Sequence, residues 1–236
     1  MLRSVITLAL AVVLVSCSNK PIVAVPKPTI KSIAIVPATN PTAYTLGNHN
    51  GAIGFLIPGA AFIAYASENR AKAKVLTEKV SALPFSPGME FTNAMAASLR
   101  DQGYTVQILE NVARVPGAPD SVDYEKLDYS ADAILHLYFS QIGIYSPPWS
   151  INYVPRVNAT GIVFVKGHRD YLYDETIYFG ADAREGKKWA IMADEKYAYP
   201  DFDFVLKNLA SVQGAFSAGV REVSKRMSEH IHAAVK

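Results

Sequence analysis

The chain has 236 residues, 50% of them hydrophobic, and its 23 Lys and Arg residues against 21 Asp and Glu give a formal net charge of +2. This balance excludes the clustered basic face that nucleic-acid binding requires, and the length suits one domain with a full-sized core rather than two. The single cysteine excludes an internal disulfide.

The start of the chain predicts an exported, lipid-anchored protein. Arg3 precedes an apolar run over residues 5–15, which is shorter than the about 20 residues of a membrane span and is typical of a secretory signal. Leu14-Val15-Ser16-Cys17 closes the run and resembles the lipobox of bacterial lipoproteins, in which cleavage precedes the cysteine and its thiol receives diacylglycerol. The alternative is that Cys17 is incidental to an ordinary cleaved signal or an apolar helix.

This resemblance implies a division of the chain into three parts. Residues 1–16 are expected to be the signal peptide, and membrane lipid on acylated Cys17 is the first expected partner. Ser18 after the lipidated cysteine implies sorting to the outer membrane, on its periplasmic face. Residues 17–28 include three prolines and predict an extended tether. Residues 29–236 are expected to form a single α/β periplasmic domain.

The first part of this domain combines a strand with an uncharged segment. Residues 30–36 predict a strand ended by Pro37, and residues 39–50 are polar and rich in turn formers. Residues 51–66 carry no charge and are too short and too broken by Gly and Pro to span a bilayer. They are expected to pack on the protein's own core, to form an oligomer interface or to contact lipid. Their interaction candidates are Phe55, Phe62 and Tyr65.

The next elements predict a parallel pair of strands. Residues 60–80 are expected to form one helix, and a second helix follows from an N-cap at Ser86 with proline in its first position to Gly103. Residues 104–109 predict a strand that can pair in parallel with the first. Residues 115–120 predict a loop, and residues 124–129 predict one helical turn.

Long alternating stretches predict a β-meander in the second half. The alternating stretches cover residues 132–145, 152–166 and 171–179, and residues 188–193 are a possible extension. Between the first two, Pro147, Pro148 and Trp149 break the pattern.

The final helix has the clearest periodicity, with apolar residues three or four apart from Leu209 to Ile231 and a cap at Asp201 or Asp203. Gly214 and Gly219 inside it predict close contact with the sheet. The fold class is therefore α/β (α+β), a single mixed sheet covered by helices in the order β-α-β-(α)-β-β-β-α with a long C-terminal helix.

The residues suited to chemistry do not form a catalytic or metal-binding pattern. Ser217 lies within a helical repeat and not on a strand-to-helix turn. His230 and His232 are two apart, whereas a helical metal pair is four apart. His136 is expected to be a hydrogen-bonded strand residue, and the carboxylates at 182, 185, 194 and 195 to lie on solvated loops. We expect no catalytic residue, no metal and no cofactor, and an envelope hydrolase is the least favoured alternative.

Three short motifs resemble a family of outer-membrane lipoproteins. They are Ile33-Ala34-Ile35-Val36-Pro37, Gly103-Tyr104-Thr105-Val106 and Ala131-Asp132-Ala133-Ile134-Leu135. With the lipobox they resemble the curli-secretion-type and penicillin-binding-protein-activator lipoproteins, which implies a TolB amino-terminal-like α/β domain over residues 30–234. Residues 51–66 and the break at residues 147–149 depart from that pattern, so neither pore formation nor synthase activation is carried over.

The expected function is therefore that of a non-catalytic envelope protein that binds another envelope protein or assembles with itself. Besides residues 51–66, the contact candidates are Tyr145, Pro148, Trp149 and Tyr153, because aromatic clusters mark interfaces. The alternative for this loop is a strand corner with Trp149 covering the core. A second function is a subunit of an oligomeric secretion channel, against which Asp174 and Glu175 place an acid on any lipid-facing side of their strand.

Overall fold

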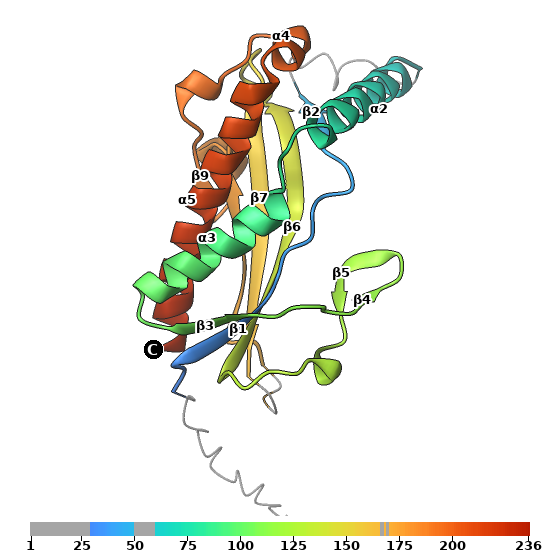
Figure 1. Cartoon of the computed structure of the whole chain (residues 1–236). Coiled ribbons are helices and arrows are strands. Elements are labelled where there is room, and N and C mark those ends of the chain that lie inside the picture. Colours follow the sequence, from blue (N-terminus) through green and yellow to red (C-terminus); the bar gives the residue numbers. More distant parts are fainter. Residues whose placement is uncertain (1–28, 50–59, 166–167, 169) are drawn as a thin grey trace, which may run out of the picture.

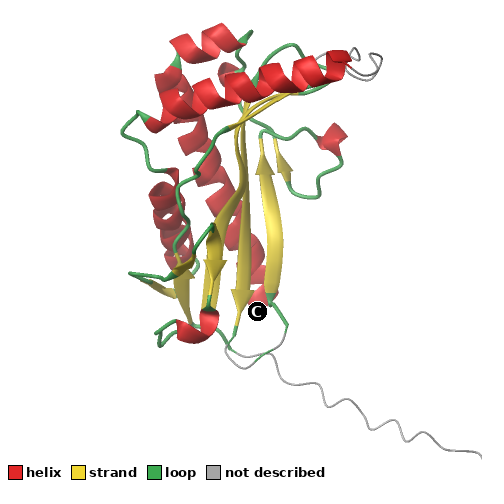
Figure 2. Ribbon diagram, turned by 90° about the vertical axis from the view of Figure 1, so that its right-hand side faces the viewer, coloured by secondary structure: helices red, strands yellow, loops and turns green. Residues whose placement is uncertain are grey.

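A computed structural model describes residues 29–49, 60–165, 168 and 170–236. The predicted signal peptide, the tether, Cys17 and Phe55 lie outside these ranges. The described chain forms one mixed sheet with helices on one face, as Figure 1 and Figure 2 show, and a long helix ends the chain. The predicted fold class is confirmed. None of the described helices has the length and apolar character that a membrane crossing requires.

The main sheet has the strand order β3-β1-β6-β7-β8-β9, with β2 also paired to β6. Its strands are β1 (Ser32–Val36), β2 (Thr45–Asn48), β3 (Thr105–Ile108), β6 (Ala133–Ser146), β7 (Val154–Phe164), β8 (Tyr173–Phe179) and β9 (Ala190–Ile191). β1 is parallel to both β3 and β6, and β6, β7 and β8 are antiparallel neighbours. The predicted parallel pair and the predicted meander are thus confirmed.

The helices lie on one face of this sheet. They are α2 (Ala60–Ser81), α3 (Pro87–Asp101), α4 (Phe202–Lys207) and α5 (Leu209–Val235), with 3-10 turns η1 (Tyr124–Lys126), η2 (Ala183–Glu185) and η3 (Glu195–Tyr197). The apolar stripe of α5 is buried against the sheet from Val212 to Ile231. Burial of such a stripe is the main source of stability for a helix in a globular protein.

The two glycines of α5 have different surroundings. A Cβ on Gly219 would lie 2.6 Å from Phe179 Cδ1 and 2.9 Å from Val157 Cγ2, so this glycine allows α5 to approach the sheet. A Cβ on Gly214 would meet no atom within 4 Å. The predicted close contact therefore holds for Gly219 alone.

The N-terminus of α3 is capped from outside the helix. Ser86 occupies the predicted N-cap position and Pro87 begins the helix, but the Ser86 side chain makes no capping hydrogen bond. Instead, Asn40 Oδ1 accepts from the Gly88 N–H at 2.9 Å and from Ser86 Oγ at 3.1 Å. A side chain from the loop between β1 and β2 thus satisfies a helix donor that Ser86 was expected to satisfy.

The second face of the sheet is only partly covered. A smaller core of Ala34, Val36, Leu109 and Ile134 lies there, on the face of the sheet opposite α3 and α5, where Figure 1 shows a β-hairpin. The hairpin consists of β4 (Arg114–Val115) and β5 (Ala118–Val122). Residues 115–120, predicted as a loop, instead contain the turn of this hairpin and parts of its two strands. Arg114 also donates to the Pro37 carbonyl, which holds the hairpin against the end of β1.

Three further predictions are corrected. Residues 39–50 contain β2, which pairs in parallel with the second half of β6. β9 extends the sheet but runs parallel to β8, so it does not continue the meander. Asp201 accepts from the Phe204 N–H and caps the short helix α4 rather than the final helix, which begins after Asn208.

Candidate interaction surface

Several loops meet at the end of the sheet where β6 stops and β7 begins, which we call the distal end. Asn48 at the end of β2 pairs with Ser146, and Tyr153 at the start of β7 bridges to Tyr199. β6 has 14 residues, so at about 3.3 Å per residue it is roughly 45 Å long. Figure 1 shows α4 at this end, with the start of β1 and the C-terminus at the other.

A buried ion pair between Arg156 and Glu185 joins strand β7 to the η2 turn at the distal end. Arg156 on β7 is 4% exposed. Its Nη1 donates to Glu185 Oε2 at 2.8 Å and its Nη2 donates to Glu185 Oε1 at 3.0 Å. The guanidinium also lies 4.0 Å from the ring centroid of Tyr145, whose pKa is raised by burial. This two-point geometry fixes the η2 turn on the sheet more tightly than a single hydrogen bond.

Trp149 lies above this support and is 40% exposed, so it does not cover the core. The guanidinium of Arg184 lies 4.4 Å from its ring centroid. Arg184 in turn donates to both carboxylate oxygens of Asp182, which holds the pKa of that carboxyl near 2. Arg184 therefore lies over the ring of an indole that is partly open to solvent.

Other apolar side chains are exposed beside Trp149. Of the eight exposed large hydrophobic residues in the described ranges, four lie at the distal end: Trp149, Ile151, Met192 and Phe204. A pocket of about 280 Å³ opens between Pro147, Trp149 and Met192. Trp and Met are enriched in protein interfaces, and clustered exposure of this kind marks a binding surface.

The structure brings five of the predicted interaction residues to the distal end. Pro148 and Trp149 are exposed, Tyr145 and Tyr65 are half-buried, and Tyr153 is buried. The hydroxyl of Tyr65 on α2 donates to the Asn48 carbonyl. Phe62 lies in the first turns of α2, where the structure describes the backbone alone.

Sequence analysis missed the other members of this surface. Ile151 lies within the predicted aromatic loop, between Trp149 and Tyr153, whereas Met192 and Phe204 come from distant segments. Arg156 and Glu185 are 29 residues apart. The alternation over residues 152–166 predicted the strand that carries Arg156, but not its pairing with Glu185.

The histidines do not form a metal site. His136 Nδ1 lies 2.6 Å from the Tyr124 hydroxyl, which confirms a hydrogen-bonded strand histidine. His232 Nδ1 lies 2.9 Å from the Tyr104 hydroxyl, whereas His230 lies beside Trp189, at a ring-centroid distance of 4.2 Å. No cluster of three potential ligands among His, Cys, Asp and Glu occurs in the described ranges.

The remaining polar candidates have structural partners. Ser217 Oγ on α5 donates to Glu90 Oε2 at 2.8 Å, which confirms it as a helix-face residue. Asp182 and Glu185 bind arginines, and Asp194 pairs with Lys196 at 2.8 Å. Asp182, Glu185 and Asp194 therefore each have a basic partner.

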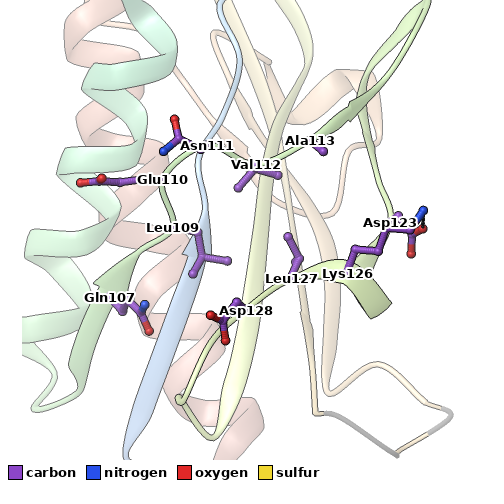
Figure 3. A pocket seen from close by; sticks show the side chains of 10 residues that line it. All are labelled: Gln107, Leu109, Glu110, Asn111, Val112, Ala113, Asp123, Lys126, Leu127 and Asp128. Atoms are coloured by element: carbon purple, nitrogen blue, oxygen red, sulfur yellow. Dashed lines mark ion pairs between the residues drawn. The ribbon is translucent and has the colours of Figure 1, made fainter.

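A second hollow lies beside the edge strand β3. Figure 3 shows Leu109, Val112 and Leu127 toward its middle and Glu110 and Asn111 directed away. Its volume is about 250 Å³, and its apolar floor belongs to the smaller core. It is a depression where the loop after β3 crosses that core.

Comparisons give remote structural similarities. No family model and no curated protein matches the sequence. A DUF330 protein from Xanthomonas campestris has a TM-score of 0.44 at 6% identity, over 89% of this chain and 88% of that one. The hypothetical protein CT253 from Chlamydia trachomatis has a TM-score of 0.41 at 12% identity, over 86% of this chain and 99% of that one. The lipoprotein GNA1162 from Neisseria meningitidis has a TM-score of 0.32 at 14% identity, over 62% of this chain and 80% of that one. The resemblance to the curli-secretion-type and penicillin-binding-protein-activator lipoproteins stays a prediction.

Proposed function

We propose that this chain is a non-catalytic, lipid-anchored envelope protein whose distal end binds a partner protein in the periplasm. The lipobox residues that end at Cys17 support the anchor. The observation that carries the binding role is the group of exposed apolar side chains around Trp149, held over the buried pair of Arg156 and Glu185.

The direction of the sheet supports this division of roles. Thr29, the first described residue, precedes β1, which pairs with the beginning of β6. The distal surface follows the end of β6, roughly 45 Å away at about 3.3 Å per residue. An anchor at Cys17 would hold the beginning of the sheet near the membrane and leave the distal end accessible to a partner.

Rigid support favours binding over a passive surface. Association orders side chains at a free-energy cost, which is smaller when a side chain is already fixed. Trp149 has a cation–π contact with Arg184, and the η2 turn that carries Arg184 is joined to β7 by Arg156 and Glu185. Aromatic and arginine side chains in such settings dominate binding energy in interfaces.

A channel subunit is the less favoured alternative. A strand facing lipid needs an apolar outward side. On the open face of the sheet, Asn158 Nδ2 instead donates to Gln141 Oε1 at 2.9 Å, and the hydroxyls of Thr160 and Thr176 lie 2.7 Å apart. This face is polar and hydrogen-bonded.

Site-specific crosslinking in cells tests the proposal. A photoreactive residue at Ile151 should give one dominant protein adduct, whereas the same residue at Met89, which is 63% exposed away from the distal end, should not. Trp149→Ser should abolish the Ile151 adduct while leaving the amount of folded protein unchanged. Equal adducts from both positions, or an adduct that survives Trp149→Ser, would contradict the proposal.

A further inference from the structure

A pocket of about 450 Å³ lies between α5 and β8, outside the distal surface. Its walls include Tyr173 and Glu175 of β8, Trp189 before β9, and His230, Ala233 and Ala234 near the end of α5. Small-molecule sites in proteins have volumes of about 300–1,000 Å³. The pocket is therefore large enough for a small ligand.

Two polar atoms of residues that line this pocket, Tyr173 Oη and Trp189 Nε1, are buried without a hydrogen-bond partner among the described residues. His230 Nδ1 instead faces Glu175 Oε2 at 3.4 Å. Tyr173 is 5% exposed. Buried polar atoms are nearly always paired in folded proteins, so two unpaired atoms on the same pocket wall point to a ligand that pairs with them.

The charges of the pocket restrict the class of ligand. A cation is disfavoured because Lys188 already occupies the cation position: its Nζ lies 2.9 Å from Glu175 Oε1 and 4.4 Å from the Trp189 ring centroid. An anion is disfavoured by the Glu175 carboxylate, whose Oε2 lies 3.4 Å from His230 Nδ1. An apolar ligand would leave Tyr173 Oη and Trp189 Nε1 unpaired.

We propose that this pocket binds a neutral, hydroxyl-rich ligand of the saccharide class. A hydroxyl group accepts from one atom and donates to another, so it can accept from the Trp189 indole N–H and donate to Glu175 Oε2. A second hydroxyl can pair with the Tyr173 hydroxyl, and Ala233 and Ala234 leave space for a ring. Neighbouring hydroxyls of a sugar supply several such groups at fixed spacing, which preorganises them for the pocket.

Trp189 provides a direct readout. The chain has two tryptophans, so in a Trp149→Phe background Trp189 is the sole indole. The full chain, in a detergent without a sugar headgroup, is titrated separately with glucose, galactose and N-acetylglucosamine. We expect a saturable change of Trp189 fluorescence and of its indole N–H resonance with at least one of them, at millimolar concentrations. Choline chloride and sodium sulfate serve as the cationic and anionic probes.

Variants separate recognition from folding. Tyr173→Phe removes a hydroxyl that has no partner among the described residues, so it should leave the protein as stable as before and yet weaken sugar binding at least tenfold. Glu175→Gln should weaken binding similarly. Tyr104→Phe, on the His232 side of α5, is the matched control and should bind normally. No response to any sugar up to 100 mM, a response to choline or sulfate instead, or normal binding by Tyr173→Phe would overturn the proposal.

Discussion

Arg156 and Glu185 form a buried two-point ion pair, with nitrogen–oxygen distances of 2.8 Å and 3.0 Å, and their side chains are only 4% and 11% exposed. Glu185 Oε1 also accepts from the Asp182 N–H at 3.0 Å. One carboxylate thereby joins β7 to the turn that carries Arg184. The shape of the distal end depends on this contact.

Removal of one partner of this pair should destabilise the protein strongly. Glu185→Leu leaves the Arg156 charge buried and unpaired, and we expect a loss of about 3–5 kcal/mol in the free energy of unfolding. The double variant Arg156→Met/Glu185→Leu should recover most of this loss, because no buried charge remains. Urea denaturation of both variants measures the difference. Lys126→Met breaks the exposed pair of Lys126 and Asp123 and should have no measurable effect; equal losses in Glu185→Leu and the double variant would contradict this account.

The two glycines of α5 should respond in opposite directions to alanine. At Gly219 the added Cβ meets Phe179 at 2.6 Å, and overpacking of this kind costs about 1–3 kcal/mol. At Gly214 it meets no atom within 4 Å, so the better helix propensity of alanine should stabilise the protein by about 0.5–1 kcal/mol. Thermal unfolding of the two variants side by side checks both signs. A stabilised Gly219→Ala would mean that α5 lies farther from β8 than described.

His136 should make the protein less stable in acid. Burial lowers its pKa from 6.5 to about 4, and the positive charge of Arg114 adds to this effect. The unfolded chain therefore takes up the proton near pH 6.5 and the folded chain near pH 4, so the stabilisation is full above pH 6.5 and falls as the pH drops toward 4. The two pKa values correspond to a loss of roughly 3 kcal/mol across this window.

Two variants assign this acid effect to burial. His136→Gln should reduce the difference in unfolding free energy between pH 7 and pH 4.5. Tyr124→Phe removes the hydrogen bond to His136 Nδ1 but keeps the histidine buried, so it should lower stability at both pH values and leave the difference nearly unchanged. An unaltered pH difference in His136→Gln would assign the effect to other groups.

The anchor can be tested by mass. If Cys17 is acylated, the mature protein should begin at residue 17 and carry the mass of a diacylglyceryl group and an amide-linked acyl chain. The Cys17→Ala variant should lack this mass and should no longer be found in the detergent-extracted membrane fraction. An unmodified thiol, or a retained leader on the mature chain, would refute the lipid anchor.

The sequence predicted the elements with long periodic patterns. The stripe of α5 and the alternation in β6, β7 and β8 repeat over many residues, so local periodicity was sufficient. The four-residue strand β2 and the two-residue strand β4 are too short for a period and depend on pairing with neighbours. The N-cap position of α3 at Ser86 was predicted, but the side chain that accepts from the helix was not, because Asn40 is 48 residues from Gly88.

The candidate surface was predictable only around its aromatic loop. Pro148 and Trp149 interrupt an alternating pattern and so mark a corner. Met192 and Phe204 come from segments whose sequences carry no comparable signal, and they become neighbours of the loop through the parallel addition of β9 and the bridge between Tyr153 and Tyr199.

The first strand of this protein has no neighbour close to it in the chain. Asp132 accepts hydrogen bonds from the backbone N–H groups of Lys31 and Ser32, across 101 and 100 residues, and both strands that flank β1 lie beyond α2 and α3. Such long-range pairing slows folding, since a large loop must close before any contact is gained. During synthesis or translocation, β1 therefore stays unpaired until β3 at residues 105–108 has emerged, and it gains its second neighbour, β6, only after the midpoint of the polypeptide.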